Sequence, residues 1–188
     1  MLPDDSFLAA TEIIDADDPA VAALAAELRA DTPDATIAAT FAHVRDRIAH
    51  VDDDASATDA VTGTIAVSAS ETLAAGVGHC FSQSHLLAAL LRANGIPAGL
   101  RYQEVDGPAG APVLHGIVSV WAPYLSATGG WLLLDPRYPA GDARHSGHEW
   151  QTRSLQPPFE RNLPEIHPDP SPAVVAALRS GGPLPTQP

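Results

Sequence analysis

Ser68–Pro97 reads SASETLAAGVGHCFSQSHLLAALLRANGIP and contains the only cysteine of the chain, Cys80. The glycines before Cys80 interrupt any helix that precedes it, and Asn94-Gly95 followed by Pro97 is a helix stop signal. Between these limits, leucines recur at the three- and four-residue spacing of a buried helix face, at Leu86, Leu87, Leu90 and Leu91. The pattern predicts a buried helix with Cys80 at its start.

A cysteine at this place has a chemical and a plain interpretation. The first turn of a helix lies at the positive end of the helix dipole, and its backbone N–H groups lack partners within the helix. Both features favour a thiolate, and the same N–H groups can bind an oxyanion. The plain interpretation is that Cys80 is a small buried apolar residue. The residues that follow the helix favour the first.

Length and charge limit the class of protein. The chain has 188 residues, and we predict a single domain over residues 1–160 followed by a proline-rich tail over 161–188. The formal net charge of −13 argues against nucleic acid or an anionic membrane as a partner. The N-terminus has no signal-peptide pattern and one cysteine cannot form an internal disulfide, so we expect a cytoplasmic protein. Nothing in the sequence indicates the oligomeric state.

Helices are predicted before the cysteine segment and strands after it. A capping Asp or Thr followed by proline predicts two amphipathic helices, over residues 18–30 and 32–48. A Ser-x-x-Glu capping box predicts a short helix over 68–75. Beyond Pro97 the pattern becomes extended, with strands predicted over 98–105, 113–121 and 131–135.

The order of these elements places three reactive residue types where they can meet. A cysteine nucleophile needs a general base, and the base needs a group that fixes its tautomer and orientation. His115 lies near the start of the second predicted strand, and Asp135 ends the third. Adjacent antiparallel strands can bring Asp135 beside His115, and a helix packed across the sheet can bring Cys80 to the other side of the imidazole. Cys80, His115 and Asp135 are therefore the candidate catalytic residues.

Motifs in this order resemble the transglutaminase-like superfamily over about residues 40–136: GHC at 78–80, LLAALLRANGIPA at 86–98, LHG at 114–116 and GWLLLDP at 130–136. More narrowly, the chain is similar to bacterial stand-alone transglutaminase-like proteins described as predicted cysteine proteases. Those proteins also carry an H-x-D pair, like His50 and Asp52, ahead of the cysteine. Two departures, Phe81 in place of a common tryptophan and Gly99 in place of a basic residue, bear on the substrate pocket.

The resemblance implies both a fold and a set of roles. The fold is α+β, a papain-like transglutaminase core in which a central Cys-bearing helix packs on an antiparallel sheet, with N-terminal helices. The roles are nucleophile for Cys80, general base for His115 and orienting acid for Asp135.

Other polar residues have weaker signals. Gln103 and His50 are candidates for the second oxyanion donor, and His85, about one turn beyond Cys80, is a candidate for facing the site. A zinc site of Cys80 with His145, His148 and Glu149 is disfavoured because their spacing fits no zinc motif. The acidic run 52–54 likewise lacks a calcium-loop pattern. We expect no metal and no cofactor.

Together these features predict a cysteine-dependent amide-bond hydrolase or acyl transferase, protease- or amidase-like, that acts on a peptide or amide through a thioester. Water is the favoured acceptor because nothing in the sequence indicates a site for an amine. The alternative from another class is a non-catalytic transglutaminase-like binding or scaffold module. An arylamine N-acetyltransferase is disfavoured. The cysteine of those enzymes typically ends an R-G-G-x-C motif, and residues Gly76–Cys80 of this chain contain no arginine.

Overall fold

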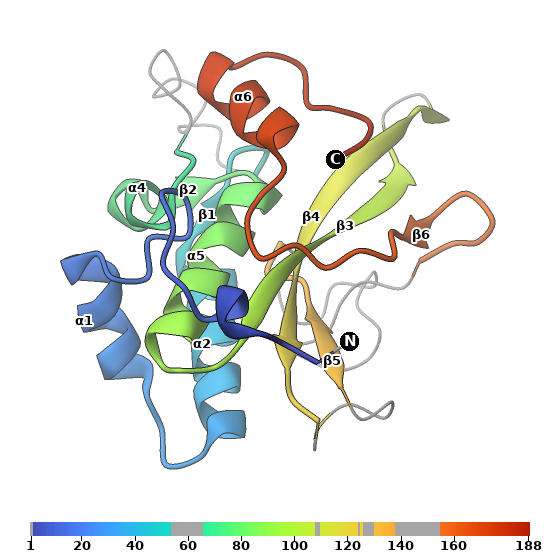
Figure 1. The fold of residues 1–188 in the computed structure, drawn as a ribbon. Helices are drawn as coiled ribbons and strands as arrows, with labels where there is room; N and C mark the ends of the chain where they lie inside the picture. Colours follow the sequence, from blue (N-terminus) through green and yellow to red (C-terminus); the bar gives the residue numbers. More distant parts are fainter. Residues whose placement is uncertain (1, 54–65, 108–109, 124, 126–129, 138–154) are drawn as a thin grey trace.

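Helices pack on an antiparallel sheet in the computed structural model, which describes residues 2–53, 66–107, 110–123, 125, 130–137 and 155–188 (Figure 1). This arrangement confirms the predicted α+β fold. The helices are α1 (Pro19–Leu28), α2 (Pro33–Arg47), α4 (Ala69–Ala75), α5 (Cys80–Ala93) and α6 (Pro172–Ser180), with a 3-10 helix η1 (Asp5–Phe7). The strands are β1 (Ala49–His50), β2 (Val77–Gly78), β3 (Ala98–Asp106), β4 (Pro112–Trp121), β5 (Trp131–Leu134) and β6 (Arg161–Asn162).

The N-terminal ends of the early helices follow their capping residues, as predicted. Asp18 accepts hydrogen bonds from two backbone N–H groups at the start of α1, and Thr32 accepts one at the start of α2. In α4 both halves of the Ser68–Glu71 capping box are present, and Gly76 ends the helix in the left-handed conformation. Local side-chain chemistry therefore sets where the chain enters α5.

Helix α5 is the centre of the molecule. Every residue from Cys80 to Arg92 is buried, because α1, α2 and α4 contact the helix on one side and β3 and β4 contact it on the other (Figure 1). A helix enclosed in this way needs apolar, small or hydrogen-bonded side chains around its whole circumference. The alanines and leucines of 86–91 meet that need, so the position of Cys80 at the helix start is fixed by core packing.

The main sheet has the strand order β5-β4-β3-β6, with every neighbouring pair antiparallel. Its three longer strands match the predicted ones. Helix and sheet approach closely at Gly116, where an added Cβ would lie 2.6 Å from a ring carbon of Phe81. Ser84 also donates a hydrogen bond of 3.0 Å to the Gly116 carbonyl. The start of α5 is therefore packed against β4 beside His115.

A second, two-stranded sheet was not predicted from the sequence. β1 and β2 pair in parallel, with Ala49 opposite Val77 and His50 opposite Gly78. Strands of two residues are too short to show an alternating pattern. This pairing ties the end of α2 to the residues that lead into Cys80.

The C-terminal residues 161–188, treated from the sequence as a proline-rich tail, carry β6 and α6. β6 pairs with β3, and α6 buries Val174 and Leu178. Pro172 occupies the first turn of α6, and Gly181 ends the helix in the left-handed conformation.

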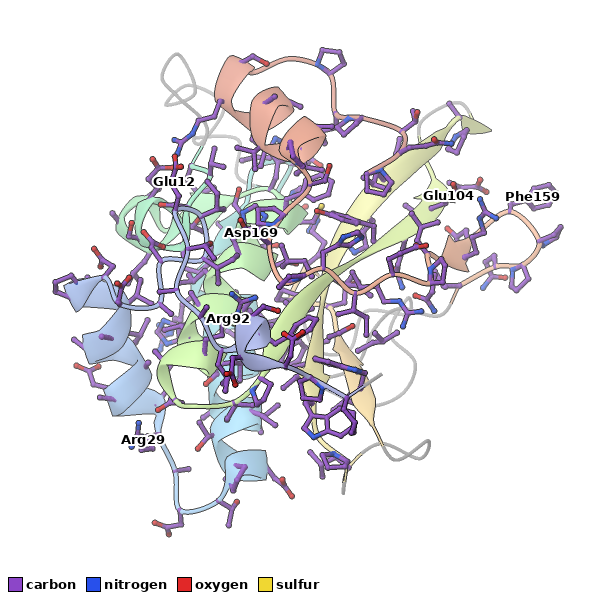
Figure 2. The ribbon with its side chains drawn as sticks, in the orientation of Figure 1. Glu12, Arg29, Arg92, Glu104, Phe159 and Asp169 are labelled. Atoms are coloured by element: carbon purple, nitrogen blue, oxygen red, sulfur yellow. The ribbon has the colours of Figure 1, made fainter. Side chains whose placement is uncertain are left out.

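Arg92 joins both ends of the chain to α5. Its guanidinium donates to the carbonyls of Ala98 at 3.0 Å, Ala9 at 2.7 Å and Pro168, and Figure 2 shows it where the N-terminal segment passes the helix.

No helix in the described part of the chain combines the length and apolar character needed to cross a bilayer.

Candidate active site

Cys80 is the first residue of α5 and is 8% exposed. The preceding residue, His79, has extended backbone angles and makes no side-chain hydrogen bond to the helix start. Because no N-cap side chain binds the first backbone N–H groups of α5, these groups and the positive end of the helix dipole stay available to a nearby anion. The thiol thus lies where the sequence analysis expected it.

His115 and Asp135 form a buried hydrogen-bonded pair. The distance from His115 Nε2 to Asp135 Oδ2 is 2.9 Å, and the residues are 5% and 0% exposed. Asp135 directly follows β5, which pairs with β4, and its other oxygen accepts a hydrogen bond of 3.1 Å from the Arg137 backbone N–H. Because Asp135 engages Nε2, the other ring nitrogen of His115 is directed away from it.

Cys80 completes the group. Burial alone would lower the pKa of His115, but the charges of Asp135 and Cys80, and hydrogen bonds to both, raise it well above the ordinary 6.5. A raised pKa favours the charged imidazolium of His115 beside the Asp135 carboxylate. The start of α5 packs against β4 at Gly116, so Cys80 lies near the hydrogen-bonded pair of His115 and Asp135.

Gln103 lies next to this set in the sheet. It is the register partner of His115 on β3 and is fully buried. Its amide Nε2 donates to Asn162 Oδ1 on β6 at 2.8 Å. The contact with β6 fixes this amide beside the imidazole, and a role as oxyanion donor stays a prediction.

His50 also lies close to the set. Burial and the positive charge of Arg137 lower the pKa of His50 to about 3, and the charge of His115 contributes in the same direction. Its Nδ1 accepts a hydrogen bond of 3.2 Å from the Asp52 backbone N–H. His50 is therefore a neutral imidazole near the candidate site, held by β1 and the turn after it.

His85 is not brought to the site. Its Nδ1 lies 2.7 Å from the Val67 carbonyl, and burial lowers its pKa to about 4. The residue is 1% exposed and connects α5 to the segment before α4. In this structure His85 is a hydrogen-bonded core histidine.

A cavity of about 360 Å³ is lined by residues from α2, β1, α5 and the segment after β5. His50, a candidate from the sequence, lines it, and two further lining residues could have been found from the sequence: Gln83 is one helical turn beyond Cys80, and Arg137 is two residues beyond Asp135. The others depend on the unpredicted β1–β2 sheet and on how α2 packs. The full lining is Arg45, Ile48, Ala49, His50, Asp53, Gln83 and Arg137.

Metal ligands do not gather in the described residues, where no group of three or more His, Cys, Asp or Glu side chains is placed to hold an ion. His145, His148 and Glu149, considered above for zinc, lie outside the described residues, as does Asp54 of the acidic run.

Comparisons with known proteins place the fold. The family model of the transglutaminase-like superfamily matches residues 22–136. A crystal structure described as a "putative cysteine protease" from Cytophaga hutchinsonii superposes with a TM-score of 0.54 at 16% identity, covering 85% of this chain and 50% of that one. The periplasmic domain of TgpA from Pseudomonas aeruginosa has a TM-score of 0.46 at 26% identity, covering 69% of this chain and 45% of that one.

The chain thus spans about half the length of these solved structures. No curated protein gives a significant match. The match of the family model extends over more than half of the sequence and includes the start of α5, β4 and the end of β5. The chain belongs to the transglutaminase-like superfamily.

Proposed function

We propose that the protein is a cysteine-dependent amide-bond hydrolase or acyl transferase in which Cys80, His115 and Asp135 act as a triad. The observation that carries this proposal is the buried imidazole of His115, which is hydrogen-bonded to Asp135 at 2.9 Å and whose pKa the charges of Asp135 and Cys80 raise. A core histidine with only a structural role is more stable in its neutral form, as His85 is, because burial disfavours the charge. A charged imidazolium that pairs with a carboxylate near a thiol can serve as the general acid in nucleophilic catalysis.

The proposed reaction has two halves. The Cys80 thiolate attacks the carbonyl carbon of an amide, the C–N bond breaks, and the His115 imidazolium gives its proton to the leaving amine. Water then attacks the thioester while His115 removes a proton from it, and the C–S bond breaks to release the carboxylic acid and the thiolate. Asp135 keeps the imidazole oriented and stabilises its charged form in both halves. The N–H groups at the start of α5 supply donors for the oxyanion.

Support from the relatives is coarser than this scheme. Transglutaminase-like membership and a structural neighbour described as a "putative cysteine protease" favour a cysteine enzyme in general. The substrate and the choice between water and an amine as acceptor are part of the proposal.

An activated ester tests the first half without knowledge of the natural substrate. We expect p-nitrophenyl acetate to give a burst of nitrophenol equal to about one per chain, with the acetyl group found on Cys80 by intact-mass and peptide mass spectrometry. Cys80→Ala removes the burst, His115→Ala slows it strongly, and His43→Ala, a change on the polar face of α2, leaves it unchanged. A burst that persists in Cys80→Ala would refute the proposal, as would a folded wild-type protein that never acylates.

A further inference from the structure

The oxyanion that forms when Cys80 attacks a carbonyl group is best held by more than one hydrogen-bond donor. The backbone N–H groups at the start of α5 supply donors from one direction, and the side chain of His79 does not occupy them. A second donor has to come from an element beside the residues that lead into Cys80. In the described part of the chain, the strand that pairs with those residues is β1.

Strand β1 is fixed to the chain that enters α5. His50 lies opposite Gly78, two residues before Cys80. Hydrogen bonds join the two strands on both sides of this pair, and one of them runs from the Val51 N–H to the Gly78 carbonyl at 3.2 Å. Paired strands lie about 4.8 Å apart and two residues of extended chain span at most about 7 Å, so the Cα atoms of His50 and Cys80 are on the order of 9 Å apart.

The imidazole of His50 contacts the residue that precedes Cys80. Its ring centre lies 5.7 Å from that of His79, in an edge-on arrangement. Burial is the main reason for the low pKa of His50, and the positive charge of His115 adds to it, as a charge does only at short range. The His50 side chain is 6% exposed. The ring is therefore enclosed near both Cys80 and His115.

The hydrogen bonds of His50 decide which ring nitrogen carries the proton. Nδ1 accepts a hydrogen bond of 3.2 Å from the Asp52 backbone N–H, so this nitrogen presents its lone pair. The Asp52 carboxylate lies 3.5 Å from the same nitrogen, which is longer than an ordinary hydrogen bond, and its side chain is 71% exposed. The proton of the neutral ring is then on Nε2, and the residues that the structure describes offer this N–H no acceptor.

An enclosed N–H without an acceptor is prepared for one that arrives with the substrate, because its desolvation has already taken place. The ring also stays neutral, since burial and the charge of Arg137 lower its pKa to about 3. A neutral imidazole can donate to a developing oxyanion and keep its proton. The other candidate, Gln103, already uses its amide Nε2 to donate to Asn162 on β6.

We propose that His50 is a catalytic residue whose Nε2–H, together with the backbone N–H of Cys80, binds the oxyanion of the acyl-transfer step. The inference rests on the proposed function, because it assigns a donor to that reaction. As the Cys80 thiolate forms the C–S bond, an electron pair of the carbonyl double bond moves to oxygen, where the two N–H groups stabilise the charge. The C=O double bond forms again when the leaving group departs, and no proton leaves His50.

Two reactions of the same thiol test this role on the full chain. Acylation by p-nitrophenyl acetate passes through an oxyanion, whereas alkylation by iodoacetamide displaces iodide from a saturated carbon and forms none. Because Cys80 is the only cysteine, both rates belong to it. Both are measured at one pH in wild type, in His50→Phe, which keeps a ring and removes the donor, and in His50→Gln, which keeps an N–H donor. His43→Phe, on the polar face of α2, is the matched control.

We expect acylation to be about 100-fold slower in His50→Phe, as for the loss of one oxyanion donor, while alkylation keeps the wild-type rate. His50→Gln loses less of the acylation rate, and His43→Phe loses none. Urea unfolding shows which variants are folded, and His50→Gln gives the same comparison of the two reactions with a smaller change to the core.

Equal losses in acylation and alkylation would mean that His50 only shapes the site, and would overturn its role as a donor. Undiminished acylation in the folded His50 variants would overturn it as well, and would leave the proposed function standing. A wild-type protein that is alkylated but never acylated would refute the proposed function itself, and the oxyanion role with it.

Discussion

Gly116→Ala should damage stability and the candidate site together. Gly116 follows His115 on β4, on the face against α5, and an alanine Cβ there would lie 2.6 Å from Phe81 Cδ1 and 3.3 Å from Phe81 Cα. An ordinary contact is 3.4–4 Å, so the Phe81 ring must move by about 1 Å and the start of α5 must give by a few tenths of an ångström. Overpacking of this kind costs about 1–3 kcal/mol, partly offset by about 0.4–1 kcal/mol from the stiffer unfolded chain. We expect a net loss of about 1–2 kcal/mol.

The shift of Phe81 also displaces its neighbour Cys80 relative to His115. At pH 6.5 a cysteine with the ordinary pKa of about 8.5 is only about 1% thiolate, so loss of the imidazolium contact can slow alkylation by up to about 100-fold. Urea unfolding and the iodoacetamide rate at pH 6.5 measure the two effects. Gly182→Ala, on the exposed C-terminal segment, is the matched control.

A double-mutant cycle decides whether the Phe81 contact is the cause. Phe81→Leu shortens the side chain that meets position 116, so it should cost less stability in the Gly116→Ala background than in wild type. Additive losses, or a Gly116→Ala protein as stable and as reactive as wild type, would refute the close packing of α5 on β4.

Two further changes probe the carboxylate and the buried arginine. Asp135→Asn removes a charge that raises the pKa of His115, so the stability gained from charged His115 shrinks. That gain is complete below the unfolded pKa of 6.5 and is lost as pH rises through the raised folded pKa. Urea unfolding should therefore show that the free energy of unfolding of the wild type exceeds that of the variant by more at pH 6 than at pH 10. An advantage that grows with pH would contradict this sign. Arg92→Met leaves three carbonyls without their donor and should cost about 3–5 kcal/mol in thermal or urea unfolding. The Cys80 alkylation rate should not change, since about 18 Å of helix separates the residues, and a large change in that rate would mean that the two ends of α5 are coupled.

Local signals in the sequence predicted most of the helical layer and the three longer strands. Capping residues act within one turn, and the leucine spacing of α5 records its burial directly. The same signals put Cys80 on a helix start, His115 on a strand and Asp135 at a strand end. Their catalytic roles stay a prediction, which the measurements above address.

Features that depend on distant packing were not predictable. The β1–β2 pairing joins residues far apart in the sequence through two-residue strands that show no periodic pattern. The packing of the C-terminal segment depends on contacts such as Tyr102 Oη, which accepts a hydrogen bond of 2.8 Å from the Ser171 backbone N–H. The cavity combines Arg45, from α2, with Arg137, beyond β5, and no local motif links them.

The pH dependence of iodoacetamide alkylation in wild type and in His115→Ala tests the central claim most directly. The single cysteine makes the rate unambiguous. An activated Cys80–His115 pair predicts fast alkylation at pH values well below the ordinary cysteine pKa of about 8.5, with that advantage lost in the variant. An inert thiol, or the same profile near pH 8.5 in both proteins, would contradict the account and leave the three residues without a catalytic role.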